Sequence, residues 1–179
     1  MNLQYSELSN EKNEVVKGPI LIKPTIFGDD RGFFYESWNR KNWCEILKSN
    51  NQKEAIFVQD NHSKSTKGVL RGLHYQTNPN PQGKLVRCIN GEIFDVAVDI
   101  RKESETYGSW VFAYLNSVNK HQLWIPEGFA HGFLTMTETA EVTYKTTSYW
   151  DKECERSIIW EDKSINIKWP IKDLSLIHI

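Results

Sequence analysis

The sequence predicts a mainly β fold, and three observations support that prediction. Turn residues recur at short intervals through the middle of the chain, from Gly68 to Gly132, which favours many short strands. Trp, Tyr and Phe make up 12% of the chain, and aromatic side chains suit packed β-sheet faces. Helical spacing of apolar residues occurs in one segment only, around Trp43, Ile46 and Leu47. Short strands with regular turns indicate a sandwich or a barrel, and a jelly roll is one solution.

The expected elements follow in order along the chain. One short helix is predicted over 39–50. The segments 84–89 and 92–100 are predicted to form a β-hairpin, because the Asn90-Gly91 pair between them accepts the positive φ angles of a tight turn. Two later segments with the same character are also predicted as strands: 142–150 and 156–160.

The segment 92–100 has two different faces if it is a strand, because successive side chains alternate. One face is wholly apolar: Phe94, Val96, Val98 and Ile100. The other mixes apolar residues with carboxylates: Ile93, Asp95, Ala97 and Asp99. A mixed face is more often solvated, but it can also line a polar pocket inside a barrel, and both interpretations stay open.

Length and composition limit the classes of function. A chain of 179 residues fits one domain. Its formal net charge of −1 disfavours nucleic-acid partners. No apolar run reaches membrane-spanning length and the first fifteen residues do not resemble a signal peptide, so a cytoplasmic location away from membranes is expected. Cys44, Cys88 and Cys154 are odd in number and lack a CxxC pair, which favours neither a disulfide framework nor a thiolate zinc site.

Two histidines are the first candidates for chemistry. His74 and His131 each lie beside glycines, which would let a ligand approach closely. A single such histidine is more often an ordinary hydrogen-bonded residue, but Arg71 and Lys84 nearby are cations that suit phosphate binding or anion stabilisation. Strict alternation would put Arg71 and His74 on opposite strand faces, so a bulge at Gly72 is expected. Two histidines and a carboxylate could bind iron or zinc, yet the His-x-His pair is missing and a metal site is disfavoured.

Tyr144 and Trp150 belong to an aromatic segment that cross-strand packing alone could explain. Alternatively, Tyr144 could donate a proton and Trp150 could stack on a nucleobase, and both roles would require the same pocket.

From about Pro24 to Pro170 the chain resembles the dTDP-4-dehydrorhamnose 3,5-epimerase family, in the nucleotide-sugar-epimerase branch of the cupins. The matching motifs occur in the family's order and spacing: DDRGFFYESW, FVQDNHSKSTKGVLRGLHYQ, QGKLVRCINGEIFDVAVDIR, YGSW, IPEGFAHGF and YKTTSYW. The resemblance implies one domain over 1–179 with a cupin-type antiparallel jelly-roll barrel and a few short helices. It also implies epimerisation at C3 and C5 of a dTDP-4-keto-6-deoxy sugar without a cofactor, in a homodimer that exchanges N-terminal strands.

Residue roles follow from the same resemblance. His74 is expected to be the proton acceptor, Tyr144 the proton donor and Lys84 the cation facing the enolate oxygen. Trp150 would stack on thymine. The remaining substrate contacts are expected to be Arg31, Glu36, Gln59, Asn61, Arg71, His131 and Glu155. The first two of these seven are expected to come from the partner subunit.

The chain departs from the family pattern at its end. After Trp169-Pro170 the family continues into a Leu-Ser-x-Lys-Asp segment, whose Lys contacts substrate and whose Asp orients the catalytic histidine, whereas this chain ends DLSLIHI. The ending is interpreted as truncated, and Asp95 is the expected substitute for orienting His74.

Three other functions remain open. A related epimerase could invert only one centre or act on another nucleotide 4-keto sugar. A non-catalytic module could bind the nucleotide sugar without exchanging its protons. A metal-dependent cupin is the least favoured.

Overall fold

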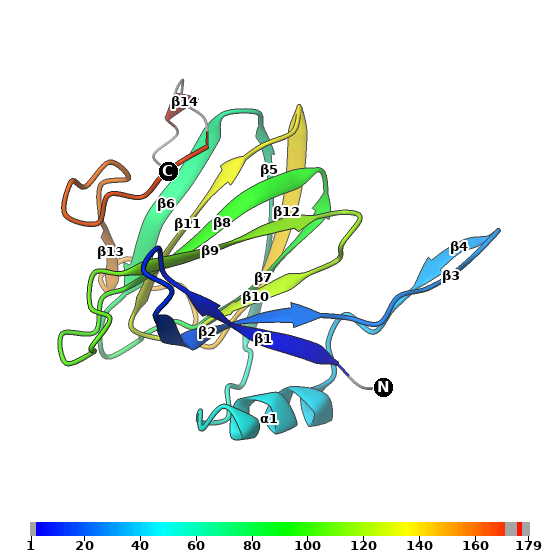
Figure 1. The fold of residues 1–179 in the computed structure, drawn as a ribbon, viewed down its shortest axis with the longest axis horizontal. Helices are drawn as coiled ribbons and strands as arrows, with labels where there is room; N and C mark the ends of the chain where they lie inside the picture. Colours follow the sequence, from blue (N-terminus) through cyan, green and yellow to red (C-terminus); the bar gives the residue numbers. More distant parts are fainter. Residues whose placement is uncertain (1–2, 171–174, 177–179) are drawn as a thin grey trace.

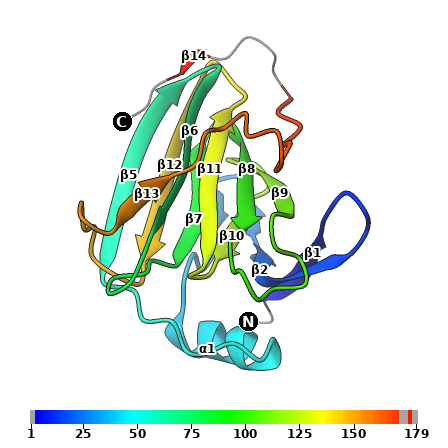
Figure 2. The same ribbon diagram turned by 90° about the vertical axis from the view of Figure 1, so that its left-hand side faces the viewer.

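A computed structural model of the chain describes residues 3–170 and 175–176. Two sheets lie face to face and form a jelly-roll sandwich, with one α-helix at one end of it (Figures 1 and 2). The predicted mainly β jelly roll is therefore confirmed, with a single α-helix among the described residues. No helix in the described part of the chain is long and apolar enough to cross a membrane.

Each of the two sheets has six strands among the described residues. Sheet I contains, in spatial order, β1 (Gln4–Ser9), β2 (Val15–Lys23), β10 (Gln122–Ile125), β7 (Lys84–Asn90), β12 (Thr139–Thr146) and β5 (Gln59–Thr66). Sheet II contains β13 (Glu155–Ser157), β6 (Val69–Gln76), β11 (Phe129–Thr135), β8 (Glu92–Asp99) and β9 (Trp110–Asn116). Strand β14 (Ser175–Leu176) pairs with β6 in parallel, whereas the other pairings are antiparallel.

The main core lies between the two sheets. Its buried residues come from both inner faces and include Val86, Ile93, Leu115 and Leu123. A second cluster covers the outer face of sheet II, where Leu70, Leu73 and other residues pack beneath the segment 158–169. The alternation predicted for β8 is confirmed, because Ile93 faces the main core and Phe94, Val96 and Val98 face the second cluster. Asp95 and Asp99, on the mixed face, are fully buried rather than solvated.

The helix α1 (Arg40–Ser49) matches the predicted segment closely. Asn39 caps its start by accepting hydrogen bonds from two backbone amides, which satisfies donors that a helix leaves unpaired. Trp43, Ile46 and Leu47 are buried against the outer face of sheet I, as their spacing predicts.

The predicted hairpin around Asn90-Gly91 is wrong. Strand β7 pairs with β10 and β12, whereas β8 pairs with β11 and β9, so the turn carries the chain from one sheet to the other. Gly91 does have a positive φ of 73°, and a Cβ there would collide with the backbone oxygen of Thr139. Asn90-Gly91 does form a turn, but the two strands that it joins pair with other strands and not with each other.

Two other strand predictions need correction at their ends. Strand β12 stops at Thr146, and the predicted remainder through Trp150 forms a loop. Of the segment 156–160, only its first two residues belong to a strand, β13.

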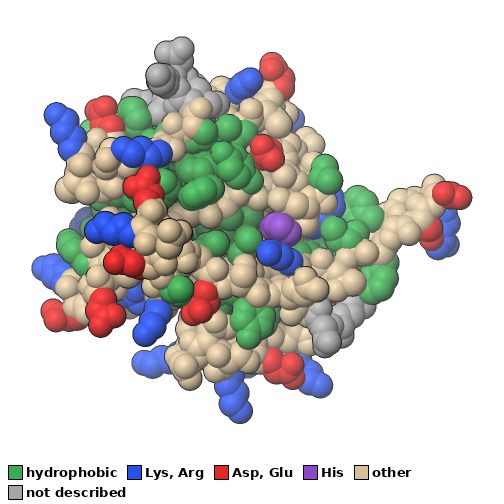
Figure 3. All heavy atoms as spheres, viewed as in Figure 1, with side chains coloured by type: hydrophobic (Ala, Val, Ile, Leu, Met, Phe, Trp, Pro, Cys, Tyr) green, Lys and Arg blue, Asp and Glu red, His purple; other side chains and the backbone are tan. Residues whose placement is uncertain are grey.

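A two-stranded arm projects from the body of the molecule (Figure 1). It consists of β3 (Phe27–Asp29) and β4 (Gly32–Phe34), paired with each other only. Three of its phenylalanines are exposed, Phe34 to 65%. Figure 3 shows hydrophobic side chains where the arm leaves the body and charged side chains at its tip.

Candidate active site

A bulge in β6 brings the predicted base and a cation to the same face of the strand. His74 pairs with His131 and Arg71 with Phe133, so three steps along β6 oppose two along β11. Gly72 lies within this irregularity with a φ of 132°, and a Cβ on it would approach the Cα of Gly132 to 2.5 Å. The bulge predicted at Gly72 is confirmed, and only glycine fits the position.

Glu155 acts on all three residues with predicted catalytic roles: His74, Lys84 and Tyr144. Its Oε1 lies 4.0 Å from Nδ1 of His74. Its negative charge raises the pKa of Lys84 and that of Tyr144. Because these residues come from β6, β7, β12 and β13, the group spans both sheets. A carboxylate that acts on a histidine, a lysine and a tyrosine together defines the candidate active site.

Lys84 is the most perturbed group of this site. Burial lowers its pKa from 10.5 to about 8, and the charges of Glu155 and Asp95 partly oppose that effect. An amine with such a pKa still carries its positive charge at neutral pH, in surroundings where few water molecules can screen it. It is suited to stabilise a negative oxygen.

Asp95 lies on β8 and contacts a different histidine from the one expected. Its Oδ1 is 2.7 Å from Nε2 of His131, and both side chains are buried. The orientation of His74 by Asp95 stays a prediction, because the register of β8 against β11 places Asp95 beside the strand of His131 and the bond that the structure shows is to His131. The predicted loss of the family's Leu-Ser-x-Lys-Asp segment concerns residues 171–179. These lie outside the described residues, except for the backbone of 175–176.

Tyr144 projects from β12 toward the same group. Burial raises the pKa of its phenol, with a lowering contribution from Arg71 and a raising one from Glu155. Arg71 donates a hydrogen bond from Nε to Oγ of Ser65 at 2.9 Å, which ties it to sheet I. A phenol with a raised pKa keeps its proton at neutral pH, as a proton donor must.

The nucleobase candidate lies at the edge of this group. Trp150 is 56% exposed, and its backbone N–H donates to Oε1 of Gln59 at 3.1 Å. Gln59 in turn donates from Nε2 to Oδ1 of Asn61 at 2.9 Å. The structure thus joins three predicted substrate-binding residues through hydrogen bonds, with an indole face open to a ligand.

Two predicted residues do not join the site within one chain. Arg31 lies in the turn of the projecting arm, where its guanidinium pairs with Asp29 at 2.6 Å and is highly exposed. Glu36 accepts hydrogen bonds from Asn39 and Asn42 at the start of α1.

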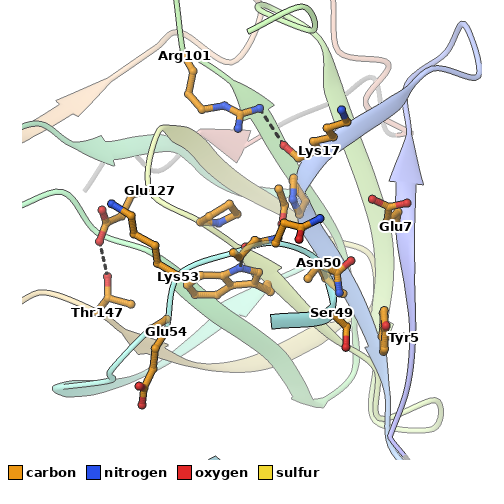
Figure 4. Close-up of a pocket in the computed structure, with 18 of the residues that line it drawn as sticks. Tyr5, Glu7, Lys17, Ser49, Asn50, Lys53, Glu54, Arg101, Glu127 and Thr147 are labelled. Carbon is orange, nitrogen blue, oxygen red and sulfur yellow. Dashed lines mark hydrogen bonds between the residues drawn. The ribbon is translucent and has the colours of Figure 1, made fainter. Parts of the chain in front are cut away.

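A large cleft lies apart from all of these residues (Figure 4). Its volume is about 1280 Å³, and it lies among β1, β2 and the segment after α1. Two of its polar groups are paired locally: Arg101 donates to the backbone oxygen of Lys17, and Thr147 donates to Glu127 (Figure 4). Size alone therefore does not mark the candidate site in this molecule.

Comparison with known proteins shows which family the chain belongs to. A family model described as dTDP-4-dehydrorhamnose 3,5-epimerase matches residues 13–177. The chain belongs to the dTDP-4-dehydrorhamnose 3,5-epimerase family.

Relatives in this family align with most of the chain. The dTDP-4-dehydrorhamnose 3,5-epimerase of Shigella flexneri is 58% identical over 154 residues, which are 86% of this chain and 83% of that protein. The Salmonella typhimurium protein of the same name is 56% identical over 155 residues, 87% and 82% of the two chains. A crystal structure of dTDP-6-deoxy-D-glucose-3,5-epimerase from Legionella pneumophila, in complex with dTDP-4-keto-L-rhamnose, shares 46% identity with a TM-score of 0.85 and covers 97% of this chain and 88% of that one.

Residue-level reasoning missed two polar residues of this epimerase fold. Ser65 is buried and holds Arg71. Gln76 is buried at the end of β6 and bonds to the loop around Trp150. Strand alternation was the one sequence signal that could have indicated that these two side chains point inward. It was not sufficient, because a polar side chain on a strand is usually solvated.

Proposed function

We propose that this chain is an isomerase that epimerises C3 and C5 of dTDP-4-dehydro-6-deoxy-D-glucose to yield dTDP-4-dehydro-L-rhamnose, a step of dTDP-rhamnose biosynthesis. This is the activity named for the family to which the chain belongs. The observation that carries the proposal is the position of Glu155, whose Oε1 lies 4.0 Å from Nδ1 of His74 and whose charge also acts on Lys84 and Tyr144 of the opposite sheet.

The reaction requires a base on one face of the sugar and an acid on the other. A 4-keto group acidifies the adjacent C–H bonds. His74 removes a proton from carbon, and the electron pair of that bond moves onto the carbonyl oxygen to form an enolate. The electron pair of the enolate then returns to the same carbon and takes the proton of Tyr144 from the opposite face, which inverts the centre and restores the ketone; His74 releases its proton to solvent and Tyr144 regains one.

Lys84 would stabilise the enolate oxygen in this scheme. Its ammonium is buried, and a fixed charge in a dry site stabilises a developing anion far more than it would in water. Glu155 and Asp95 support the charged form of Lys84.

Nucleotide binding and assembly complete the proposal. Trp150 would stack on thymine, with Gln59, Asn61, Arg71, His131 and Glu155 as further substrate contacts.

We propose a homodimer of single-domain subunits in the cytoplasm, in which the exposed arm carries Arg31 and Glu36 to the partner's site. Its exposed phenylalanines favour such burial, and light scattering of wild type and of a Phe33→Ser, Phe34→Ser variant would test it.

The stereochemistry of the product tests the proposed reaction. The purified chain is incubated with dTDP-4-keto-6-deoxyglucose, and the sugar is reduced and analysed by NMR. Inversion at both C3 and C5 is expected. Inversion at one centre would instead indicate a monoepimerase, and an unchanged sugar that is nevertheless bound would indicate a binding module.

A further inference from the structure

Two loops flank the site and are tied to each other. One, 77–83, connects β6 to Lys84, and the other, 147–154, carries Trp150 toward Glu155. Asn80 donates from Nδ2 to Asp151 at 2.7 Å, and the backbone N–H of Thr77 donates to the oxygen of Cys154 at 2.9 Å. Any residue that holds both loops therefore affects the position of Trp150.

Gln76 is the side chain that reaches both loops from β6. Its Nε2 donates to the backbone oxygens of Asn80, at 2.7 Å, and of Tyr149, at 3.2 Å. Its Oε1 accepts from the backbone N–H of Asp151 at 2.9 Å. Gln76 is only 7% exposed, so its amide is fully used and its partners have little access to water that could replace it.

Gln76 forms hydrogen bonds to the backbone of both residues that flank Trp150. They hold the carbonyl of the residue before it and the N–H of the residue after it, while Gln59 of β5 accepts from its own N–H. One glutamine belongs to sheet II and the other to sheet I. The backbone of Trp150 is thus held from both sheets, although its indole is exposed.

We propose that Gln76 is a positioning residue for nucleotide binding, which fixes the loop so that the exposed indole of Trp150 is held in place for the base. The inference rests on the proposed function and deepens it. An aromatic side chain on a loose loop would lose conformational freedom each time it stacked, and a loop already fixed by the protein avoids much of that loss. Gln76 lies two residues from His74 on one strand, so it also sets the distance between the nucleotide subsite and the reacting centre.

Two variants of Gln76 test this. Gln76→Glu keeps the acceptor for Asp151 but replaces the donor that faces two carbonyls with an oxygen, and Gln76→Met removes both functions at similar length. Gln52→Glu is the matched control, because the Gln52 amide also donates to a backbone oxygen, that of Gly18, and accepts an N–H, that of the Trp124 indole, while neither bond involves the loops 77–83 and 147–154. Unfolding curves of all three identify any variant that fails to fold.

The measurements are the Kd of dTDP by calorimetry, and KM and kcat of epimerisation. We expect Gln76→Glu and Gln76→Met to raise Kd and KM about tenfold or more, with kcat changed by no more than about threefold. In a Trp150→Ala background the same substitutions should add almost nothing, since residues that act through one another are not additive. A role in folding alone would give equal losses in both backgrounds.

The outcomes separate the two proposals. Unchanged dTDP affinity in both Gln76 variants, losses no larger than those of Gln52→Glu, or full additivity with Trp150→Ala would overturn the inference while leaving the epimerase proposal intact. A wild-type chain that binds no dTDP and exchanges no substrate protons would overturn both.

Discussion

Replacing Lys84 by methionine should remove activity and yet stabilise the fold near neutral pH. The side chain is buried, and its pKa falls from 10.5 to about 8 on folding. That difference corresponds to about 3 kcal/mol disfavouring the ammonium in the folded state. Methionine has similar length without the charge, so Lys84→Met should raise the free energy of unfolding at pH 7 by up to about 3 kcal/mol.

The pH dependence of that gain is the decisive feature. The unfolded state binds the proton that the folded state releases between pH 8 and 10.5, so wild-type stability rises across this window. The advantage of Lys84→Met is full below about pH 8 and should vanish near pH 10.5, where the amine is neutral in both states. Urea unfolding at pH 7, 8, 9 and 10 measures it, with Lys102→Met, at an exposed position, as the control. A variant less stable than wild type at pH 7, or a difference independent of pH, would refute this reasoning.

Three further predictions concern the site. Glu155→Gln removes a charge that raises the pKa of Lys84, so the alkaline decline of kcat/KM should begin at lower pH than in wild type, and an unmoved profile would contradict this. Tyr144→Phe should lower epimerisation about 100-fold or more while substrate deuterium exchange by His74 persists with retention; equal loss of both in NMR assays would show that Tyr144 is not the donor. Gly72→Ala should lower the free energy of unfolding by about 3 kcal/mol, because a Cβ at φ 132° meets backbone at 2.5 Å; urea curves that match wild type would disprove the need for glycine.

Features set by neighbours in the sequence could be predicted from it. The helix over 39–50 follows from a cap and an apolar stripe that lie within one segment. The bulge follows from a glycine between two residues that must share a face. These are local conditions, so the pattern contains the information needed to infer them.

Features set by distant partners could not be predicted in this way. Asn90-Gly91 signals a turn with positive φ, but only the sheet order decides that the flanking strands separate. Asp95 was placed correctly on a mixed face, yet its contact with His131 depends on the register of β8 against β11. Gln76 resembles any polar residue at a strand end until the two loops that it holds are placed in space.

The arrangement also explains why one carboxylate, that of Glu155, matters for several steps. Glu155 lies near the base and favours the charged form of the lysine. Burial raises the pKa of Tyr144, and the same charge adds to that effect, which favours the protonated acid. A single negative charge thereby favours the protonated form of both the cation and the acid within one site.

Deuterium exchange at C3 and C5 of dTDP-4-keto-6-deoxyglucose in D₂O, followed by NMR, tests the central claim most directly. The wild-type chain should incorporate deuterium at both carbons, and His74→Ala should abolish exchange. His62→Ala, which alters an exposed histidine on β5, should behave as wild type. Exchange that continues undiminished in His74→Ala, or a wild-type chain that binds dTDP and exchanges neither proton, would contradict the account.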